Sequence, residues 1–145
     1  KEVLFKIDDI LFLSRIIEEK FPKFDQVIPN EFNHRIILNI KELESGLNLV
    51  KPMVDEKTKR LNIDLSKDVL ELKASSDYGQ SKFEIPVEFS GDKLSIPFNI
   101  DYISEFLRAL ESERIFMDII NEKSQILFKP ESDDDHLYIT MPMRF

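Results

Sequence analysis

The sequence predicts an α+β fold in which one arrangement, a strand followed by a helix and three further strands, occurs twice. Between residues 34 and 141, short stretches alternate between apolar and polar residues, as is typical of strands. Two of these stretches run directly into an asparagine and then into apolar residues at helical spacing. Because two helices cannot enclose eight strands, we expect antiparallel sheets on the outside with both helices on one side of them.

The composition favours one domain of ordinary size. The 145 residues are 42% hydrophobic, which is enough for a real core. We find no apolar run long enough to cross a membrane and no basic-then-apolar leader. The lack of cysteine excludes disulfides, thiol catalysis and cysteine-based zinc sites, and suits a cytoplasmic protein. A net charge of −8 by itself disfavours a nucleic-acid partner.

The first 28 residues predict a hairpin and a connector. Two short apolar stretches, Val3–Phe5 and Ile10–Leu13, are separated by two aspartates. A hairpin alone is marginal in water, so this segment should pack on something else or be the remnant of a larger unit. Pro22 predicts an extended connector, and Pro29 marks the boundary before the main domain.

In the first copy, a strand over 34–38 leads to Asn39, which is placed as a helix N-cap with Glu42 three residues later. The helical stripe consists of Ile40, Leu43, Leu47, Val50 and Val54. Strands are expected at 61–65, 69–74 and 83–89. Gly46, inside the helix, is either a tolerated surface glycine or a point where the helix approaches the sheet or DNA closely.

In the second copy, a strand over 94–98 leads to Asn99, the second N-cap, and a helical stripe. Strands follow at 114–119, 125–128 and 137–141. Pro86 and Pro97 fall inside predicted strands, so their missing N–H groups should lie at unpaired positions.

The sequence shows no pattern typical of a catalytic or metal-binding site. The two histidines, His34 and His136, have no partner at the spacing of a zinc pair. The run 133–136 lacks the ligand spacing of a calcium loop and reads as a solvated acidic turn. The sequence contains no phosphate-binding glycine loop and no nucleophile elbow. We therefore predict a protein that is not an enzyme and needs no cofactor or metal.

The last nine residues, Leu137–Phe145, form an apolar chain end. Chain ends are usually frayed and polar, so an apolar one should be tied into a sheet, lie in a groove or offer a contact surface. Met141 and Met143 either complete a core or form the wall of a site for a partner's apolar residues, a role for which the unbranched methionine side chain is well suited. The pattern alone leaves both readings open.

Three segments together resemble the bacterial DNA polymerase III beta subunit family, the sliding clamps. They are the terminal Met-Pro-Met-Arg of residues 141–144, the connector 15–29 with Phe-Pro at 21–22, and Ile-Pro-Phe-Asn-Ile-Asp-Tyr-Ile at 96–103. They occur in the family's order and spacing, and the resemblance covers essentially the whole chain. It implies the DNA-clamp fold, with both helices on the inner face of a ring, and it implies a middle-domain remnant over 1–28 and a C-terminal domain over 29–145.

The resemblance also implies a processivity factor of DNA replication that encircles double-stranded DNA. Its implied partners are the DNA polymerase III catalytic subunit, the clamp loader and other proteins with clamp-binding motifs. Full-length clamps close head to tail as homodimers. This chain is expected to be monomeric and not to bind membranes. In the family such partners dock as short peptides, and the matching residues here are Pro22, Val27, Tyr102, Ile139, Met141, Pro142, Met143 and Arg144.

Two departures from the family pattern bear on this site. Many members carry Arg where this chain has Gln26, and the middle-domain loop that forms the other wall of the cleft is absent from the 145 residues. For Tyr102, the pattern alone fits a half-buried aromatic side chain as well as a ligand contact.

The resemblance implies two further sets of residues less specifically. Lys57, Lys59 and Arg60 are candidates for DNA-facing residues, because the sign of charge on the inner face matters more than the net charge. Cations near a helix C-terminus explain some of them equally well. Pro52 and Met53 match the family's subunit interface.

Two other readings remain open. The first is a stand-alone β-rich module that binds a peptide and has no DNA role. The second is a small-ligand or metal-binding domain that uses the acidic run beside His136.

Overall fold

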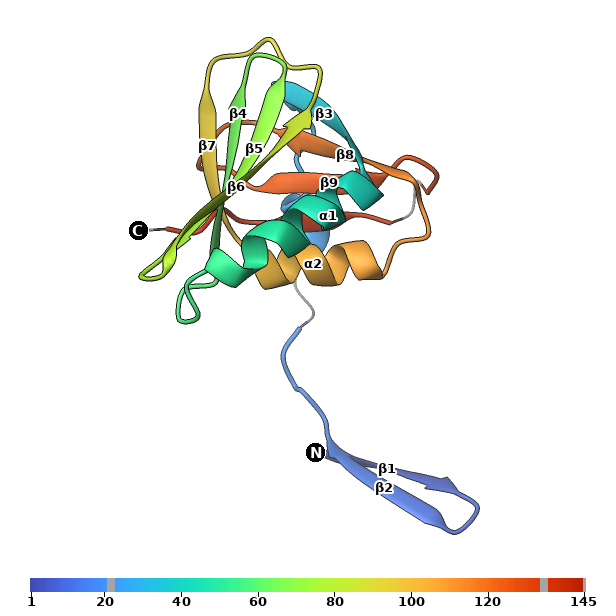
Figure 1. The fold of residues 1–145 in the computed structure, drawn as a ribbon. Coiled ribbons are helices and arrows are strands. Elements are labelled where there is room, and N and C mark those ends of the chain that lie inside the picture. Colours follow the sequence, from blue (N-terminus) through green and yellow to red (C-terminus); the bar gives the residue numbers. More distant parts are fainter. Residues whose placement is uncertain (21–22, 134–135, 145) are drawn as a thin grey trace.

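The structure, a computed structural model, describes residues 1–20, 23–133 and 136–144. It begins with the predicted hairpin of β1 (Glu2–Ile7) and β2 (Ile10–Arg15), in which Ile7 pairs with Ile10. Neighbouring residues in a strand point to opposite faces, so the exposure of both Leu4 (59%) and Phe5 (50%) leaves both faces of the hairpin apolar. In Figure 1 the hairpin stands apart from the other strands.

The predicted arrangement of a strand, a helix and three strands is confirmed in both copies. The first copy consists of β3 (His34–Asn39), α1 (Ile40–Val50), β4 (Arg60–Ser66), β5 (Val69–Ser76) and β6 (Gly79–Pro86). The second consists of β7 (Leu94–Asn99), α2 (Ile100–Arg108), β8 (Arg114–Ile119), β9 (Ile126–Pro130) and β10 (Tyr138–Thr140). Two short 3₁₀ turns, η1 (Phe24–Gln26) and η2 (Lys51–Met53), lie before β3 and after α1.

The two copies exchange their first strands. The first sheet has the order β6-β5-β4-β7, and the second sheet has the order β10-β9-β8-β3. Each sheet therefore contains three strands of one copy and the leading strand of the other, and every neighbouring pair is antiparallel. Figure 1 shows both helices lying together along one side of these sheets. This exchange joins the two copies into one domain.

Both helices start as predicted and in matching ways. The side chain of Asn39 accepts a hydrogen bond from the backbone N–H of Glu42 (3.1 Å), and that of Asn99 accepts one from Asp101 (2.9 Å). The first helical N–H groups, those of Ile40 and Ile100, donate to the carbonyl oxygens of the residues that precede β8 and β4. Each helix thus begins against a strand of the other copy.

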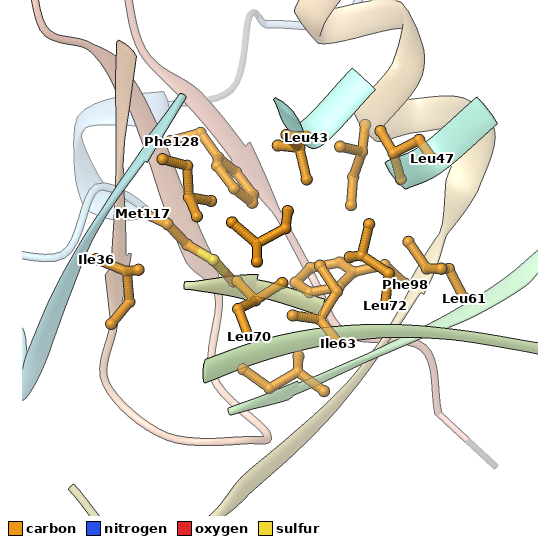
Figure 2. Close-up of a cluster of buried hydrophobic side chains, with 14 of the residues drawn as sticks. Ile36, Leu43, Leu47, Leu61, Ile63, Leu70, Leu72, Phe98, Met117 and Phe128 are labelled. Carbon is orange, nitrogen blue, oxygen red and sulfur yellow. The ribbon is translucent and has the colours of Figure 1, made fainter. Parts of the chain in front are cut away.

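The core fills the space between the sheets and the helices. Figure 2 shows Ile36, Met117 and Phe128 of the second sheet meeting Ile63 and Leu70 of the first, with Leu43 and Leu47 reaching in from α1. Gly46 is buried, and a Cβ built there would lie 2.5 Å from Phe83 and 2.7 Å from Leu72. The close approach of the helix to the sheet is thus the correct reading of Gly46.

Two predicted boundaries are wrong. The strand expected at 83–89 runs instead from Gly79 to Pro86, because β5 continues to Ser76 and turns at once to pair with Gly79. The α-helix expected to reach Val54 ends at Val50 and continues as η2 around Pro52, although Val54 is buried as its place in the stripe suggested.

The prediction for the two strand prolines holds. The N–H of Val87 donates to Asp68 beside β5, so the nitrogen of Pro86 points away from that strand. The carbonyl of Pro97 accepts from Met143 and therefore points away from β4, together with the nitrogen of the same residue. Neither proline removes a hydrogen bond from the sheet.

Candidate functional site

The C-terminal segment enters the fold as the edge strand β10. Tyr138 faces the core, where its ring stacks on Phe106 of α2 at 4.5 Å between centroids and 12° between planes. The next residue, Ile139, therefore lies on the outer face of the second sheet, paired with Leu127 of β9. Met141 is 51% exposed and Met143 is half-buried outside the core cluster, so the reading that they complete the core is wrong.

Beyond β10 the chain end crosses to the first sheet. The N–H of Met143 donates to the carbonyl oxygen of Pro97 in β7 (2.8 Å), and Pro142 is buried. This contact fixes the tail against β7, the edge strand of the first sheet. An edge strand needs such cover, because its outward backbone groups would otherwise be open to another chain.

The tail forms one side of a cavity of about 440 Å³, which we call the tail cavity. Its lining residues are Ser95, Pro97, Glu122, Lys123, Pro142, Met143 and Arg144. Two prolines and a methionine supply its apolar lining, and Glu122, Lys123 and Arg144 supply charged groups. Apolar cavities of this size with a few polar groups at the rim are typical of ligand and peptide sites.

The loop between β8 and β9 supplies the opposite side of the tail cavity. Asn121 shapes this loop, because its side chain accepts from the N–H groups of Lys123 (2.9 Å) and Ser124 (3.0 Å). The carboxylate of Glu122 accepts from the backbone N–H of Ser95 in β7 (2.6 Å). The second sheet is thus tied to the first at the same strand that holds the tail.

The connector reaches the second sheet near β9. The side chain of Gln125, just before β9, donates to the carbonyl oxygen of Val27 (3.5 Å). Val27 is 53% exposed, whereas Leu127 on the outer face of β9 is buried outside the core cluster. The structure therefore brings Val27 to the end of the strand that pairs with Ile139.

Tyr102 approaches the same edge strand from the helix side. It projects from α2 and is 56% exposed. The pKa of Tyr138 is raised, mainly by burial of its hydroxyl and further by the charges of Glu105 and Tyr102. Tyr102 lies one helical turn before Phe106, whose ring stacks on Tyr138, and so it lies on the α2 side of β10, the face opposite Ile139.

Of the eight predicted docking residues, the structure gathers Pro142, Met143 and Arg144 around the tail cavity and brings Val27 to the end of β9, the strand that pairs with Ile139 of β10. Pro22 lies outside the described residues. Sequence reasoning missed Glu122 and Lys123. They lie in the polar loop between β8 and β9, and nothing in the sequence of that loop indicated that it would contact the C-terminal tail.

The three candidate DNA-facing residues separate. Lys57 and Lys59 lie in the loop after η2, where the carbonyl of Lys59 accepts from the first N–H of α2. Arg60 alternates with the core residue Leu61 and so points to the outer face of the first sheet, where its Nε donates to Asn62 (3.0 Å). Arg60 therefore lies on the sheet face opposite the helices.

Pro52 and Met53 form part of η2, beside the edge of the first sheet. Pro52 is exposed, while Met53 is half-buried against the core. The sulfur of Met53 lies 3.7 Å from the position of a Cβ built on Gly79, where β6 begins. The candidate interface residues thus lie next to the exposed edge strand.

The part of the chain that the structure describes holds no group of three side chains placed to bind a metal ion. Of the acidic run beside His136, two aspartates fall outside that part. The described helices are all too short or too polar to cross a bilayer.

Comparison with known proteins gives consistent matches. Residues 25–144 match the model of the DNA polymerase III beta subunit, C-terminal domain. The chain is similar to the beta sliding clamps of Synechocystis sp. (28% identity over 99% of this chain and 37% of the relative) and Escherichia coli (26% over 95% and 38%). The chain thus spans less than two fifths of these relatives.

Solved structures give the same picture. The DNA polymerase III beta subunit of Thermotoga maritima superposes with a TM-score of 0.83 at 28% identity, over 99% of this chain and 40% of that one. The subunit from Pseudomonas aeruginosa superposes with a TM-score of 0.86, over 99% of this chain and 40% of that one. At 23% identity, this match supports the fold alone.

Proposed function

This chain belongs to the DNA polymerase III beta subunit family, and on that basis we propose that it is the partner-docking end of a ring-forming sliding clamp. In this proposal residues 29–145 are the clamp's C-terminal domain and residues 1–28 are the last strands and connector of its middle domain. The hairpin supports the division, because its apolar residues on both faces are typical of strands buried inside a larger unit.

The observation that carries the proposal is the tail cavity. Its apolar floor of Pro97, Pro142 and Met143 is held in place by the hydrogen bond from Met143 to Pro97, so the site is formed before a partner arrives. An extended peptide can place an apolar anchor on this floor while Arg144 meets its polar groups. The approach around β10 is then lined by Val27, Ile139, Met141 and Tyr102. Pro22 is proposed as a further docking residue on the resemblance alone.

In the whole clamp this site tethers the replicative polymerase, the clamp loader and other motif-bearing proteins to encircled double-stranded DNA. The role is one of binding, without catalysis, metal or cofactor. The ring closes head to tail, and Pro52 and Met53 beside the exposed β6 edge are the proposed contribution of this chain to the subunit interface. By itself the chain is monomeric.

Direct DNA contact is proposed for Lys57 and Lys59, which lie in the loop after η2 beside the first residues of α2. Arg60, which points to the opposite sheet face, is not suited to that contact. Replacing Lys57 and Lys59 with Gln in the full ring should weaken DNA retention and reduce its salt dependence. Unchanged retention would contradict this part of the proposal.

Titration of the isotope-labelled chain with a peptide of the Gln-Leu-x-Leu-Phe kind tests the docking site. Amide shifts are expected at Val27, Tyr102, Ile139 and residues 141–144, and the substitution Met143→Ala should abolish them. Met53→Ala, a control at a half-buried methionine beside β6, should leave them unchanged. Shifts confined to another surface would instead favour a stand-alone peptide-binding module without a DNA role.

A further inference from the structure

The methionines hold all the sulfur of this chain, which has four of them and no cysteine. Met141 and Met143 lie in the C-terminal tail, within the proposed docking site, whereas Met53 and Met117 lie in η2 and β8. A peroxide converts a methionine thioether to a sulfoxide. Because the peroxide must contact the sulfur, the fold decides which of the methionines react.

The four methionines differ in their exposure to solvent. Met117 is fully buried, and Figure 2 shows it among the core side chains. Met53 is half-buried against the core. Met141 is 51% exposed, and the half-buried Met143 lines the tail cavity. A peroxide in solution therefore reaches the two tail methionines while the core methionine stays protected.

The fold can tolerate a sulfoxide at either tail position. The tail is held to the first sheet by backbone atoms, since the N–H of Met143 donates to the carbonyl oxygen of Pro97 (2.8 Å). The side chains of Met141 and Met143 lie outside the core cluster. Their oxidation therefore alters the surface that a partner meets and leaves the backbone contact of the tail in place.

Docking is more sensitive than folding to this change. The thioether of methionine is flexible and polarisable, so it suits contact with the apolar Leu and Phe anchors of a partner peptide. A sulfoxide is polar and chiral, and it disrupts such methionine-rich contacts. Burying its oxygen beneath an apolar anchor costs free energy, because the anchor offers no hydrogen-bond donor.

We propose that Met141 and Met143 are sites of reversible oxidation by peroxide, and that their sulfoxides weaken apolar docking at the tail. The inference rests on the proposed function, since the partner's anchor must contact the tail. It adds a chemical control to that site, in which the oxidation state of two side chains sets the affinity for partners.

The reaction with hydrogen peroxide needs no other reagent. The sulfur lone pair attacks one peroxide oxygen, and the O–O bond breaks as the S–O bond forms. The proton of the transferred oxygen passes to the departing hydroxide, which leaves as water. Sulfur is oxidised by two electrons and the peroxide is reduced. A thiol-dependent methionine sulfoxide reductase reverses the change, because two thiols become a disulfide while the oxygen leaves as water.

Peptide mapping by mass spectrometry on the whole folded chain tests the sites. After a brief treatment with hydrogen peroxide, Met141 should gain one oxygen fastest and Met143 should follow. Met117 should stay unmodified until the chain is unfolded in urea, and the urea midpoint of the treated chain should change little. Equal oxidation of Met117 and Met141 in the folded chain, or a Met143 that stays unmodified, would overturn the inference.

The effect on docking is measured by fluorescence anisotropy with a labelled peptide of the Gln-Leu-x-Leu-Phe kind, which contains no sulfur. After removal of the peroxide, the oxidised chain should bind about tenfold more weakly than the untreated chain, as expected for a buried polar group without a hydrogen bond. Treatment with the reductase and a dithiol should restore the affinity. Unchanged affinity in a chain that carries both sulfoxides would overturn the inference and leave the proposed function intact.

Variants locate the effect, and each is compared with itself before and after peroxide treatment. Leucine is apolar, of similar size and without sulfur, so Met141→Leu and Met143→Leu together should make the affinity insensitive to peroxide. Each single variant should retain part of the loss, and the Met53→Leu control should retain all of it. A full loss in the double variant would overturn the inference. Failure of the untreated chain to bind the peptide, or binding insensitive to Met143→Ala, would overturn the proposed function as well.

Discussion

The ion pairs on the outer faces of the two sheets differ in how far they are buried. On the second sheet, Arg35 donates two hydrogen bonds, of 2.6 and 2.7 Å, to the carboxylate of Asp118. The guanidinium of Arg35 lies 4.8 Å from the ring centre of Phe116. Asp118 is 1% exposed. On the first sheet, Lys73 and Lys82 form a ladder of ion pairs with Asp64, Glu71 and Glu84. This ladder is more open, with side-chain exposures from 15% for Glu71 to 65% for Lys82.

This difference suggests different uses for the two faces. A buried carboxylate depends on its one cation, since an unpaired charge in the interior is very costly. An exposed ladder contributes little to stability, and its members can rearrange for an incoming charge. The buried pair on the second sheet is therefore structural, whereas the ion pairs on the first sheet are more open to solvent. Each of the following substitutions tests part of that contrast.

The largest effect is expected for Arg35→Met, which leaves the buried Asp118 without its cation. The free energy of unfolding in urea should fall by about 2–3 kcal/mol, at or below the low end of the range for a broken buried pair because Arg35 is itself half exposed. Lys82→Met on the other sheet serves as the matched control and should cost less than about 1 kcal/mol. Equal losses at the two sites would remove the distinction between the faces.

A smaller loss is expected for Gly46→Ala, which tests the inner side of the first sheet. The new methyl group would press on Leu72, which is fully buried, and on Phe83. Overpacking costs about 1–3 kcal/mol and is partly offset by a gain of about 1 kcal/mol in helix propensity, so the net loss should be about 1 kcal/mol in urea unfolding. Ser45→Ala, on the exposed side of the same helix, should change stability far less, and a Gly46→Ala protein more stable than the parent would contradict this packing.

Much of the fold, but not the pairing of distant strands, could be predicted from the sequence. The alternation of residues and the asparagine caps predicted the helix starts and the order of the eight strands and two α-helices from β3 to β10. They could not predict that β3 and β7 exchange sheets, because pairing between distant strands depends on side chains that fit across the core. Nor could they place Asp118, whose surroundings come from β3, more than eighty residues earlier in the chain.

The candidate site was predictable only in part, and for a similar reason. Family-like residues near the chain end pointed to Pro142, Met143 and Arg144, which the structure gathers around one cavity. Strand periodicity was enough to predict that Arg60 and Leu61 point to opposite faces of the sheet. The prediction that Arg60 faces DNA together with Lys57 and Lys59 relied only on their closeness in the sequence. Glu122 carries no local signal, since its role arises from a contact with Ser95 that only the folded chain creates.

The two helix caps offer a comparison between the copies. Asn39→Ala and Asn99→Ala should each lower the free energy of unfolding by about 1 kcal/mol, because each removes the acceptor of one helical N–H. Replacement by Ser instead should recover most of the loss in each case. Because the two caps bond to different residues and share no partner, the double alanine variant should show the sum of the two losses within about 0.5 kcal/mol. A negligible effect at either site would mean that the cap there does not contribute to stability.

The smallest effect concerns the pH dependence of the ladder. The pKa of Glu71 is lowered, first by its hydrogen bond with Lys73 and then by that with Lys82. A carboxyl group whose pKa is lower in the folded state stabilises the fold above its unfolded pKa of 4.5, and this contribution disappears as the pH falls through the lowered value. Glu71→Gln should therefore cost less than about 1 kcal/mol at pH 7, and the two proteins should converge in stability well below pH 4.5. Glu88→Gln, an exposed carboxylate outside the ladder, controls for the loss of one negative charge. If the cost of Glu71→Gln persists unchanged at low pH, the group stabilises the first sheet by packing rather than by charge, and the ladder is less free to exchange partners than the open face suggests.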